Sequence, residues 1–173
     1  LEDVARTLGL DHPETLASRH SLAGAYRDAG RLGEAIPLFE QNLTDFIRIL
    51  GPDRPDTFTS RSTLAGAYRE AGRLNEAIDL CERTLADQSH VLGPDHPDTL
   101  TSRNNLAYAY HAAGRLTEAI ALFEQALTAA PDDLDINTYL ATWQRFKGNQ
   151  AKADGYLKRV GELNAGRAAD LQR

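Results

Sequence analysis

The feature that most constrains this chain is a proline-containing phrase that returns at a fixed interval. LGPDRPDT (50–57) and LGPDHPDT (92–99) are nearly identical and lie 42 positions apart, and a third version, LGLDHPET (8–15), lies another 42 positions upstream. A fixed period of this length is typical of repeat proteins, in which similar units stack on one another. The chain is therefore predicted to be an array of repeats.

The residues between the copies repeat as well, without gaps. SLAGAYRDAGRLGEAIPLFE (21–40) aligns with TLAGAYREAGRLNEAIDLCE (63–82) and NLAYAYHAAGRLTEAIALFE (105–124). A fourth copy, YLATWQRFKGNQAKADGYLK (139–158), keeps the spacing but follows the third after 34 residues. The predicted units are 1–7 (the end of a truncated preceding repeat), 8–49, 50–91, 92–133, 134–164 (a divergent 34-residue repeat) and 165–173 (a tail or partial capping helix).

Each unit is predicted to contain two helices. In the first unit, Leu22 and Tyr26 belong to a run of apolar residues at helical spacing that ends at Gly30, and Ala35 and Phe39 belong to a second run. The composition agrees, because alanine and leucine dominate while β-branched and aromatic residues are sparse. We therefore expect an all-α fold.

The recurring phrase is predicted to end one helix and begin the next. Glycine adopts a positive φ at a helix end and the following proline cannot continue the helix, whereas a proline in the first turn of the next helix costs little. The predicted N-caps, each with an acidic partner three residues later, are Asp11 with Glu14, Asp53 with Asp56 and Asp95 with Asp98. Pro37 lies inside a predicted helix and is expected to cost a backbone hydrogen bond or bend it.

The motif Leu-Ala-x-x-Tyr followed by Ala-x-x-x-Phe resembles the tetratricopeptide repeat, and the 42-residue period with the wording GPDHPDT…NNLA resembles its kinesin light chain subtype. The matching residues are Leu22, Ala23, Tyr26, Ala35 and Phe39; Leu64, Ala65, Tyr68 and Ala77; Leu106, Ala107, Tyr110, Ala119, Phe123 and Pro131; and Leu140, Ala141, Ala153 and Leu157. The resemblance implies an all-α, right-handed α-solenoid (superhelix) of stacked antiparallel helix pairs.

Two departures from the family pattern stand out. Arg19, Arg61 and Arg103 occupy a position where the family often has tryptophan or another large apolar residue. We expect each arginine stem to pack between neighbouring first helices while its head reaches water or a cap acid. Gln144 stands where tyrosine is expected, which predicts a more loosely packed or terminal fourth unit.

No residue pattern indicates catalysis, a cofactor or a metal site. His12 and His96 occupy equivalent turn positions, but Arg54 takes that place in the middle unit, where a metal site would not tolerate a fixed cation. Cys81 replaces the phenylalanine of the sister units and is predicted to be a small buried hydrophobe, and Trp143 is predicted to belong to the core. The chain is therefore predicted not to be an enzyme, with no catalytic residues, no metal and no cofactor.

Charge and hydropathy narrow the range of partners. The formal net charge of −6 disfavours nucleic-acid binding, which depends on a basic surface. No apolar stretch is long enough for a membrane span, and a single cysteine suits a cytoplasmic protein. Arginine outnumbers lysine 16 to 3, which we interpret as a sign of a bacterial origin.

The resemblance also implies a function: first helices line a concave groove, so the chain is predicted to be a non-catalytic module that binds a protein or peptide there. The candidate peptide-binding residues are Arg27, Arg69, Asn104, Asn105, Tyr108, His111 and Arg145. The cations favour an acidic peptide, Asn105 matches an asparagine that in related repeats bonds the peptide backbone, and Tyr108 offers an apolar anchor. Asp28 and Glu70 could neutralise the cations, so a purely structural role at the helix ends stays open.

Two alternatives remain from the sequence. The array could be a structural spacer or oligomerisation surface, or it could be the sensor segment of a larger bacterial nucleotide-switch signalling protein. LEDVARTL (1–8) aligns with LTDFIRIL (43–50), which predicts a segment cut from a longer array that self-associates through its N-terminal end.

Overall fold

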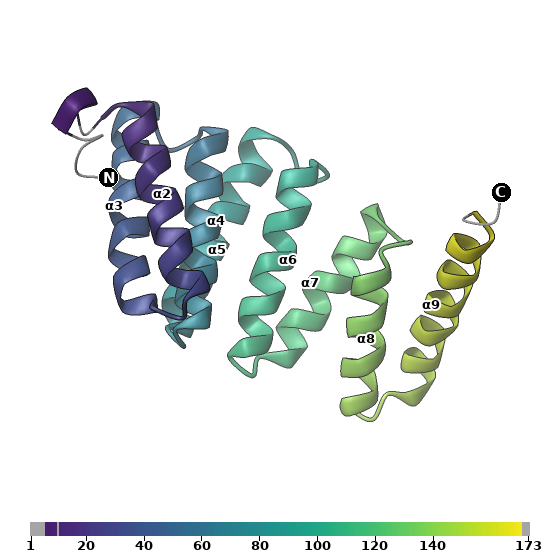
Figure 1. Ribbon diagram of the computed structural model, residues 1–173. Helices are drawn as coiled ribbons and strands as arrows, with labels where there is room; N and C mark the ends of the chain where they lie inside the picture. Colours follow the sequence, from purple (N-terminus) through teal and green to yellow (C-terminus); the bar gives the residue numbers. More distant parts are fainter. Residues whose placement is uncertain (1–5, 10, 171–173) are drawn as a thin grey trace.

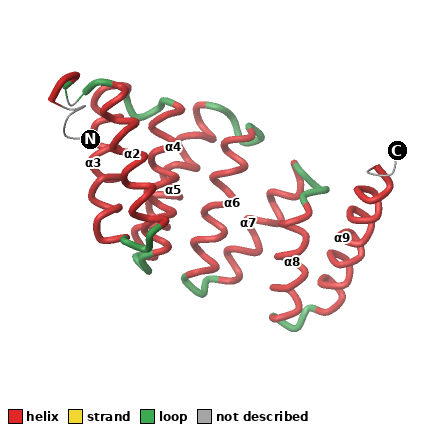
Figure 2. The backbone as a smooth tube through the Cα atoms, in the orientation of Figure 1, coloured by secondary structure: helices red, strands yellow, loops and turns green. Residues whose placement is uncertain are grey.

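The computed structural model describes residues 6–9 and 11–170. Over these residues the chain consists of helices and short turns, with no strand (Figure 2). After a helical turn at 6–8, the helices are α2 (Pro13–Asp28), α3 (Leu32–Leu50), α4 (Pro55–Glu70), α5 (Leu74–Val91), α6 (Pro97–Ala112), α7 (Leu116–Ala129), α8 (Leu134–Phe146) and α9 (Gln150–Asp170). Most of the predicted 1–7 segment lies outside the described residues.

The helices form stacked antiparallel pairs. α2 packs against α3, α4 against α5, α6 against α7 and α8 against α9, and each second helix also packs against the first helix of the following pair. Figure 1 shows the pairs succeeding one another along the array, with the two termini at opposite ends. The predicted all-α solenoid is confirmed.

The turn inside each pair is built in the same way in the first three repeats. A glycine with φ of 73–75° follows the first helix, and the next residue is an arginine whose guanidinium lies 4.2–4.5 Å from the centre of a tyrosine ring. The same arginine pairs with a glutamate three residues later. These groups are Gly30, Arg31, Tyr26 and Glu34; Gly72, Arg73, Tyr68 and Glu76; and Gly114, Arg115, Tyr110 and Glu118.

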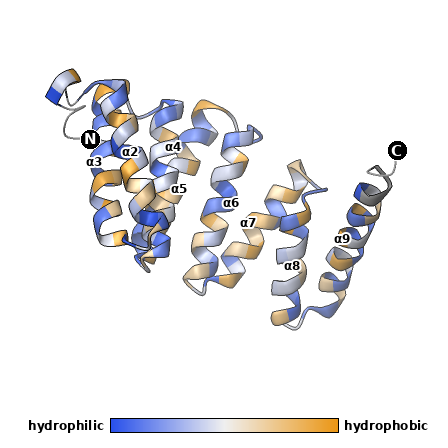
Figure 3. Cartoon of the chain, in the orientation of Figure 1, coloured by the Kyte–Doolittle hydropathy of each residue, from blue (hydrophilic) through white to orange (hydrophobic). Residues whose placement is uncertain are grey.

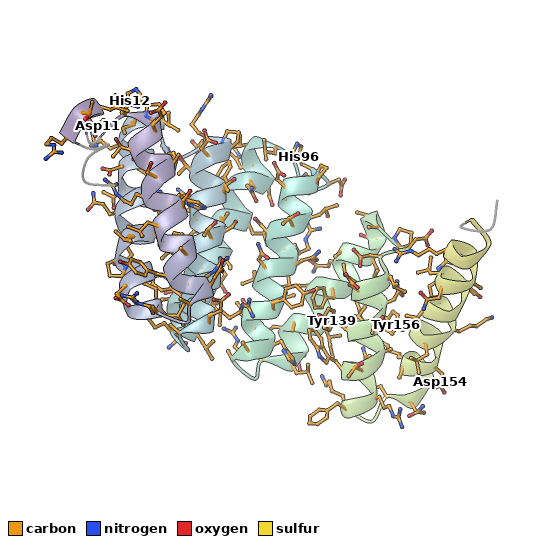
Figure 4. The ribbon with its side chains drawn as sticks, viewed as in Figure 1. Asp11, His12, His96, Tyr139, Asp154 and Tyr156 are labelled. Carbon is orange, nitrogen blue, oxygen red and sulfur yellow. The ribbon has the colours of Figure 1, made fainter. Side chains whose placement is uncertain are left out.

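The turn between pairs corrects the predicted caps. The N-caps are His12, Arg54 and His96, and not the predicted Asp11, Asp53 and Asp95 one residue earlier. Proline follows each N-cap and forces it into the extended backbone that an N-cap adopts. Nδ1 of each histidine accepts a hydrogen bond at 3.2 Å, from the backbone N–H of Glu14 or Asp98. Both histidines lie at the same end of the array's first helices (Figure 4).

The core lies between the two helices of each pair and between successive pairs. Two alanines recur in each repeat, one in the first helix (Ala65 in the second repeat) and one in the second helix (Ala77), and these two are at most 3% exposed. Hydrophobic and hydrophilic residues alternate along each helix (Figure 3). Cys81 is buried, and this burial raises the pKa of its thiol to about 11, which disfavours a nucleophilic thiolate. Trp143 is 6% exposed. The predictions that both residues belong to the core are confirmed.

The recurring arginine of the first helices pairs differently from expectation. The buried guanidinium of Arg19 donates to Asp45 on α3, and that of Arg61 donates to Asp87 on α5, both at 2.5 Å. The prediction that these heads reach water or a cap acid is therefore wrong. A buried guanidinium needs an anionic partner, and the second helix of the same repeat supplies one.

The third repeat lacks this ion pair. Ala129 stands 42 positions after Asp87, and Arg103 donates to the backbone carbonyl of Pro94 at 3.2 Å. The second helix α7 also ends at Ala129. The loss of the acid therefore coincides with the shortening of the second helix.

Each pair of neighbouring repeats is joined by a side-chain hydrogen bond at the same repeat position. A side chain of each later first helix donates to a glutamate of the preceding second helix: Tyr68 to Glu40 at 2.7 Å, Tyr110 to Glu82 at 2.5 Å and Gln144 to Glu124 at 3.2 Å. Gln144 thus replaces the expected tyrosine but preserves its bond. The hydrogen bond to the third repeat is kept, but α8 packs less extensively on α7 than α4 on α3 or α6 on α5, in line with the predicted looser packing of the fourth unit.

Two helices run without a break past a position that the sequence analysis singled out. α3 continues through Pro37 as one helix, although proline has no N–H to donate to the preceding turn. α9 runs to Asp170, past the unit boundary predicted at 164.

Candidate functional site

The predicted cations share one end of the first helices. Arg27, Arg69, His111 and Arg145 lie in the last turns of α2, α4, α6 and α8, respectively. We call the surface that these four helices share the first-helix face. A cation in the last turn interacts favourably with the helix dipole, so this placement alone has a structural explanation.

Three of the predicted site residues meet in one pocket. Arg69 on α4 and Asn105 and Tyr108 on α6 line a pocket of about 50 Å³, which we call the Arg69 pocket. Its remaining wall includes Gly66 and the buried Cys81. A space of this size admits a peptide carbonyl or a methyl group, since one water molecule occupies about 30 Å³ in the liquid.

The chemistry of the Arg69 pocket suits a peptide backbone or a carboxylate. The carboxamide of Asn105 carries both a donor and an acceptor, which is what a peptide group requires. The guanidinium of Arg69 can grip a carboxylate with two hydrogen bonds. The two residues come from adjacent repeats, so a ligand in this pocket contacts both.

The cations of the predicted column differ in their pairing. Arg27 lies 3.5 Å from the carboxylate of Asp28 and 4.0 Å from that of Glu70, as the structural alternative anticipates. Within the described part of the chain, Arg69 and Arg145 have no carboxylate within 4.0 Å. Arg69 and Arg145 are therefore the cations of this column best able to accept an acidic ligand.

The third and fourth repeats are joined by an aromatic cluster. The His111 ring stacks on Trp143, with centroids 4.4 Å apart and planes 14° apart. The Tyr108 ring meets Phe123 edge to face at 5.3 Å and Tyr139 at 5.4 Å. Burial, together with the neighbouring Tyr139, raises the pKa of Tyr108 to about 12. Tyr108 is thus held in place and stays neutral at physiological pH, whereas His111 serves packing.

Asn104 is half-buried like its neighbour Asn105, but its carboxamide has a different environment. Its Oδ1 atom is buried and has no hydrogen-bond partner among the described residues. The structure does not place Asn104 in the Arg69 pocket. The NNLA segment therefore presents one asparagine to this pocket and one amide oxygen that is without a partner.

Two larger pockets, which the sequence interpretation missed, lie between successive first helices. Pocket I, between α2 and α4, has a volume of about 470 Å³ and includes Phe46, Ile49 and Leu50 of α3. Pocket II, between α4 and α6, has a volume of about 230 Å³ and includes Gln88 of α5. All nine residues that line pocket II lie 42 positions after a residue of pocket I. The 42-residue alignment contained the signal, but only the structure shows that these residues surround open space.

The described residues contain neither a metal-binding cluster nor a membrane-spanning helix. No group of three or more histidine, cysteine, aspartate or glutamate side chains is placed there to hold a metal ion. No helix in the described part of the chain has the length and hydrophobicity needed to cross a membrane.

Comparison with known proteins adds to this geometry. The family model for the tetratricopeptide repeat matches residues 21–86 and 56–132. A search of curated proteins finds no match. A kinesin light chain-like protein of Podosopora anserina with nearly identical TPR-like repeats is 33% identical, with a TM-score of 0.81 over 96% of this chain and 82% of that chain.

Two more distant solved structures share the fold alone. BtubC (BKLC) from P. vanneervenii is 18% identical, with a TM-score of 0.80 over 89% of this chain and 65% of that chain. MamA from Desulfovibrio magneticus RS-1 is also 18% identical, with a TM-score of 0.73 over 95% of this chain and 82% of that chain.

Proposed function

The chain belongs to the tetratricopeptide repeat family, whose repeats generally mediate protein–protein interaction, and on this premise we propose that it is a non-catalytic module that binds a peptide or protein on its first-helix face. Proteins built from these repeats are typically scaffolds without catalytic activity. The face formed by α2, α4, α6 and α8 runs across all four helix pairs and offers the partner an extended surface.

The observation that carries this proposal is the Arg69 pocket. A guanidinium, a carboxamide and a phenol converge there from two neighbouring repeats. Tyr108 is already held by aromatic contacts to Phe123 and Tyr139, so little side-chain entropy is lost when a ligand binds. A preorganised set of this kind suits recognition of a short extended segment.

The unpaired cations indicate the character of the partner. Arg69 and Arg145 offer guanidinium groups to carboxylates, whereas Arg27 is already held by Asp28 and Glu70. We therefore propose an acidic peptide whose carboxylates lie along the C-terminal ends of α4, α6 and α8. Its affinity should fall as salt increases, because exposed charges are screened.

The test is selection from a random peptide library on the wild-type chain, followed by affinity measurements on variants. Arg69→Ala and Asn105→Ala should each weaken a selected acidic peptide about tenfold, the effect of one lost hydrogen bond to a charged or amide group. Arg83→Ala, which removes an exposed cation from α5, is the charge-matched control and should leave binding unchanged.

If Arg83→Ala and Arg69→Ala lost the same amount of affinity for the peptide, binding would depend only on the net charge of the chain. Selection of basic peptides, or full binding by both pocket variants, would contradict the proposed site.

A further inference from the structure

Pockets I and II are two copies of one site with different chemistry. Phe46 and Gln88 occupy the same repeat position, one in each pocket. Around Phe46, pocket I adds the apolar side chains of Leu16, Ile49 and Leu50. Pocket I is therefore apolar at the position where pocket II carries a carboxamide.

Each pocket also contains a buried polar atom without a partner. Oε1 of Gln88 in pocket II and Oγ of Ser60 in pocket I have no hydrogen-bond partner among the described residues. The two residues are 4% and 2% exposed. An unpaired buried polar group is costly, so a ligand that supplies the missing bond gains affinity from it. In pocket I, where the side chains around Phe46 are apolar, only the backbone of a peptide ligand is left to supply this bond, whereas in pocket II a ligand side chain can supply it. Because a carboxamide presents a donor and an acceptor together, another carboxamide pairs with it best.

Carboxylates at the pocket rims exclude a competing assignment. Asp56 lines pocket I and Asp98 lines pocket II, each in the first turn of a first helix. An acidic side chain in either pocket would meet a like charge there. The neutral carboxamide meets no such repulsion, and the acidic residues of the peptide belong near Arg69 at the other end of the helices.

We propose that the partner peptide crosses pockets I and II side by side, with an apolar side chain in pocket I and the carboxamide of an asparagine or glutamine in pocket II. This assignment rests on the proposed function and specifies the ligand of the same face. Successive first helices contact each other little, so they lie farther apart than the roughly 8–10 Å of packed helices. An extended chain advances about 3.3 Å per residue and its side chains alternate between faces, so two side chains that enter pockets on the same face are about four residues apart.

The test exchanges the chemistry of the two pockets. A random 12-residue library (about 40 Å when extended) is selected on the wild-type chain and on the variants Phe46→Gln and Gln88→Phe. The wild-type pool should pair an apolar residue with asparagine or glutamine. Gln88→Phe should replace the carboxamide with a second apolar residue, and Phe46→Gln should replace the apolar residue with a second carboxamide. Pools that keep the wild-type pattern in both variants would overturn the assignment.

A second measurement guards against variants that repack. Gln88→Leu has nearly the same volume as wild type and should weaken a wild-type-selected peptide about tenfold in fluorescence anisotropy. Gln125→Leu, on the exposed surface of α7, is the matched control and should have no effect. Unchanged affinity in Gln88→Leu would overturn the assignment.

The outcomes separate the two proposals. A wild-type pool without any consensus contradicts the proposed function, and with it this assignment. If the consensus disappears from peptides selected on Arg69→Ala but is unchanged in peptides selected on the Phe46 and Gln88 variants, only the pocket assignment is contradicted.

Discussion

At the scale of single residues, the side-chain pairs explain why certain polar residues recur. The Tyr68–Glu40 and Tyr110–Glu82 hydrogen bonds each join one repeat to the next. The sequence revealed these tyrosines and glutamates as regular columns, but no pattern within one chain indicates which column contacts which. The ion pair of Arg19 was missed for the same reason.

The Tyr68 pair predicts a dependence of stability on alkaline pH. Burial, followed by the hydrogen bond to Glu40, raises the pKa of Tyr68 to about 12. The folded-state pKa lies above the unfolded value of about 10, so the stabilisation is complete below about pH 10 and is lost as the pH rises through about 12. Between about pH 9 and about pH 11, the free energy of unfolding should therefore fall more steeply for wild type than for Tyr68→Phe.

Urea unfolding at the two pH values measures this difference. Tyr26→Phe is the matched control, because no carboxylate accepts from Tyr26 among the described residues. If the free energy of unfolding fell equally with pH in wild type and Tyr68→Phe, the Tyr68–Glu40 bond would not contribute to the pH dependence of stability.

At the scale of helices, the prolines and glycines of the recurring phrase were sound guides to where helices begin and end. The caps were misplaced by one residue because proline at the first helical position moves the N-cap to the residue before it. Histidine is a less common N-cap than aspartate, so the known residue preferences at N-caps favoured the aspartate that precedes each histidine. Pro37 was correctly identified as anomalous, yet the surrounding packing keeps α3 continuous.

Replacement of Pro37 should stabilise the fold. Pro37 is exposed within α3, and the equivalent position in the third repeat is Ala121. Pro37→Ala restores a helical hydrogen bond and should raise the free energy of unfolding by about 1–3 kcal/mol. Thermal and urea unfolding measure the gain. The control Asp79→Ala, at the equivalent position of α5, should change stability by about 0.7 kcal/mol or less; an equal gain in both variants would contradict the explanation.

At the scale of the whole molecule, the 42-residue period was sufficient to predict the stacked helix pairs, because a unit of this kind buries its apolar face only against its neighbours. The Arg69 pocket was only partly predictable. Its residues were named from their columns, but pairing of Arg27 with Asp28 and stacking of His111 on Trp143 depend on side-chain geometry. Pockets I and II depend on open space, which a sequence does not display.

The central claim is that the first-helix face binds the partner, and amide hydrogen exchange tests it most directly. Exchange is compared for the wild-type chain alone and saturated with a library-selected acidic peptide. The account predicts slower exchange in α4 and α6, centred on Arg69 and Asn105, with α7 unchanged. Slower exchange confined to α5 and α7, or no change at saturation, would contradict it.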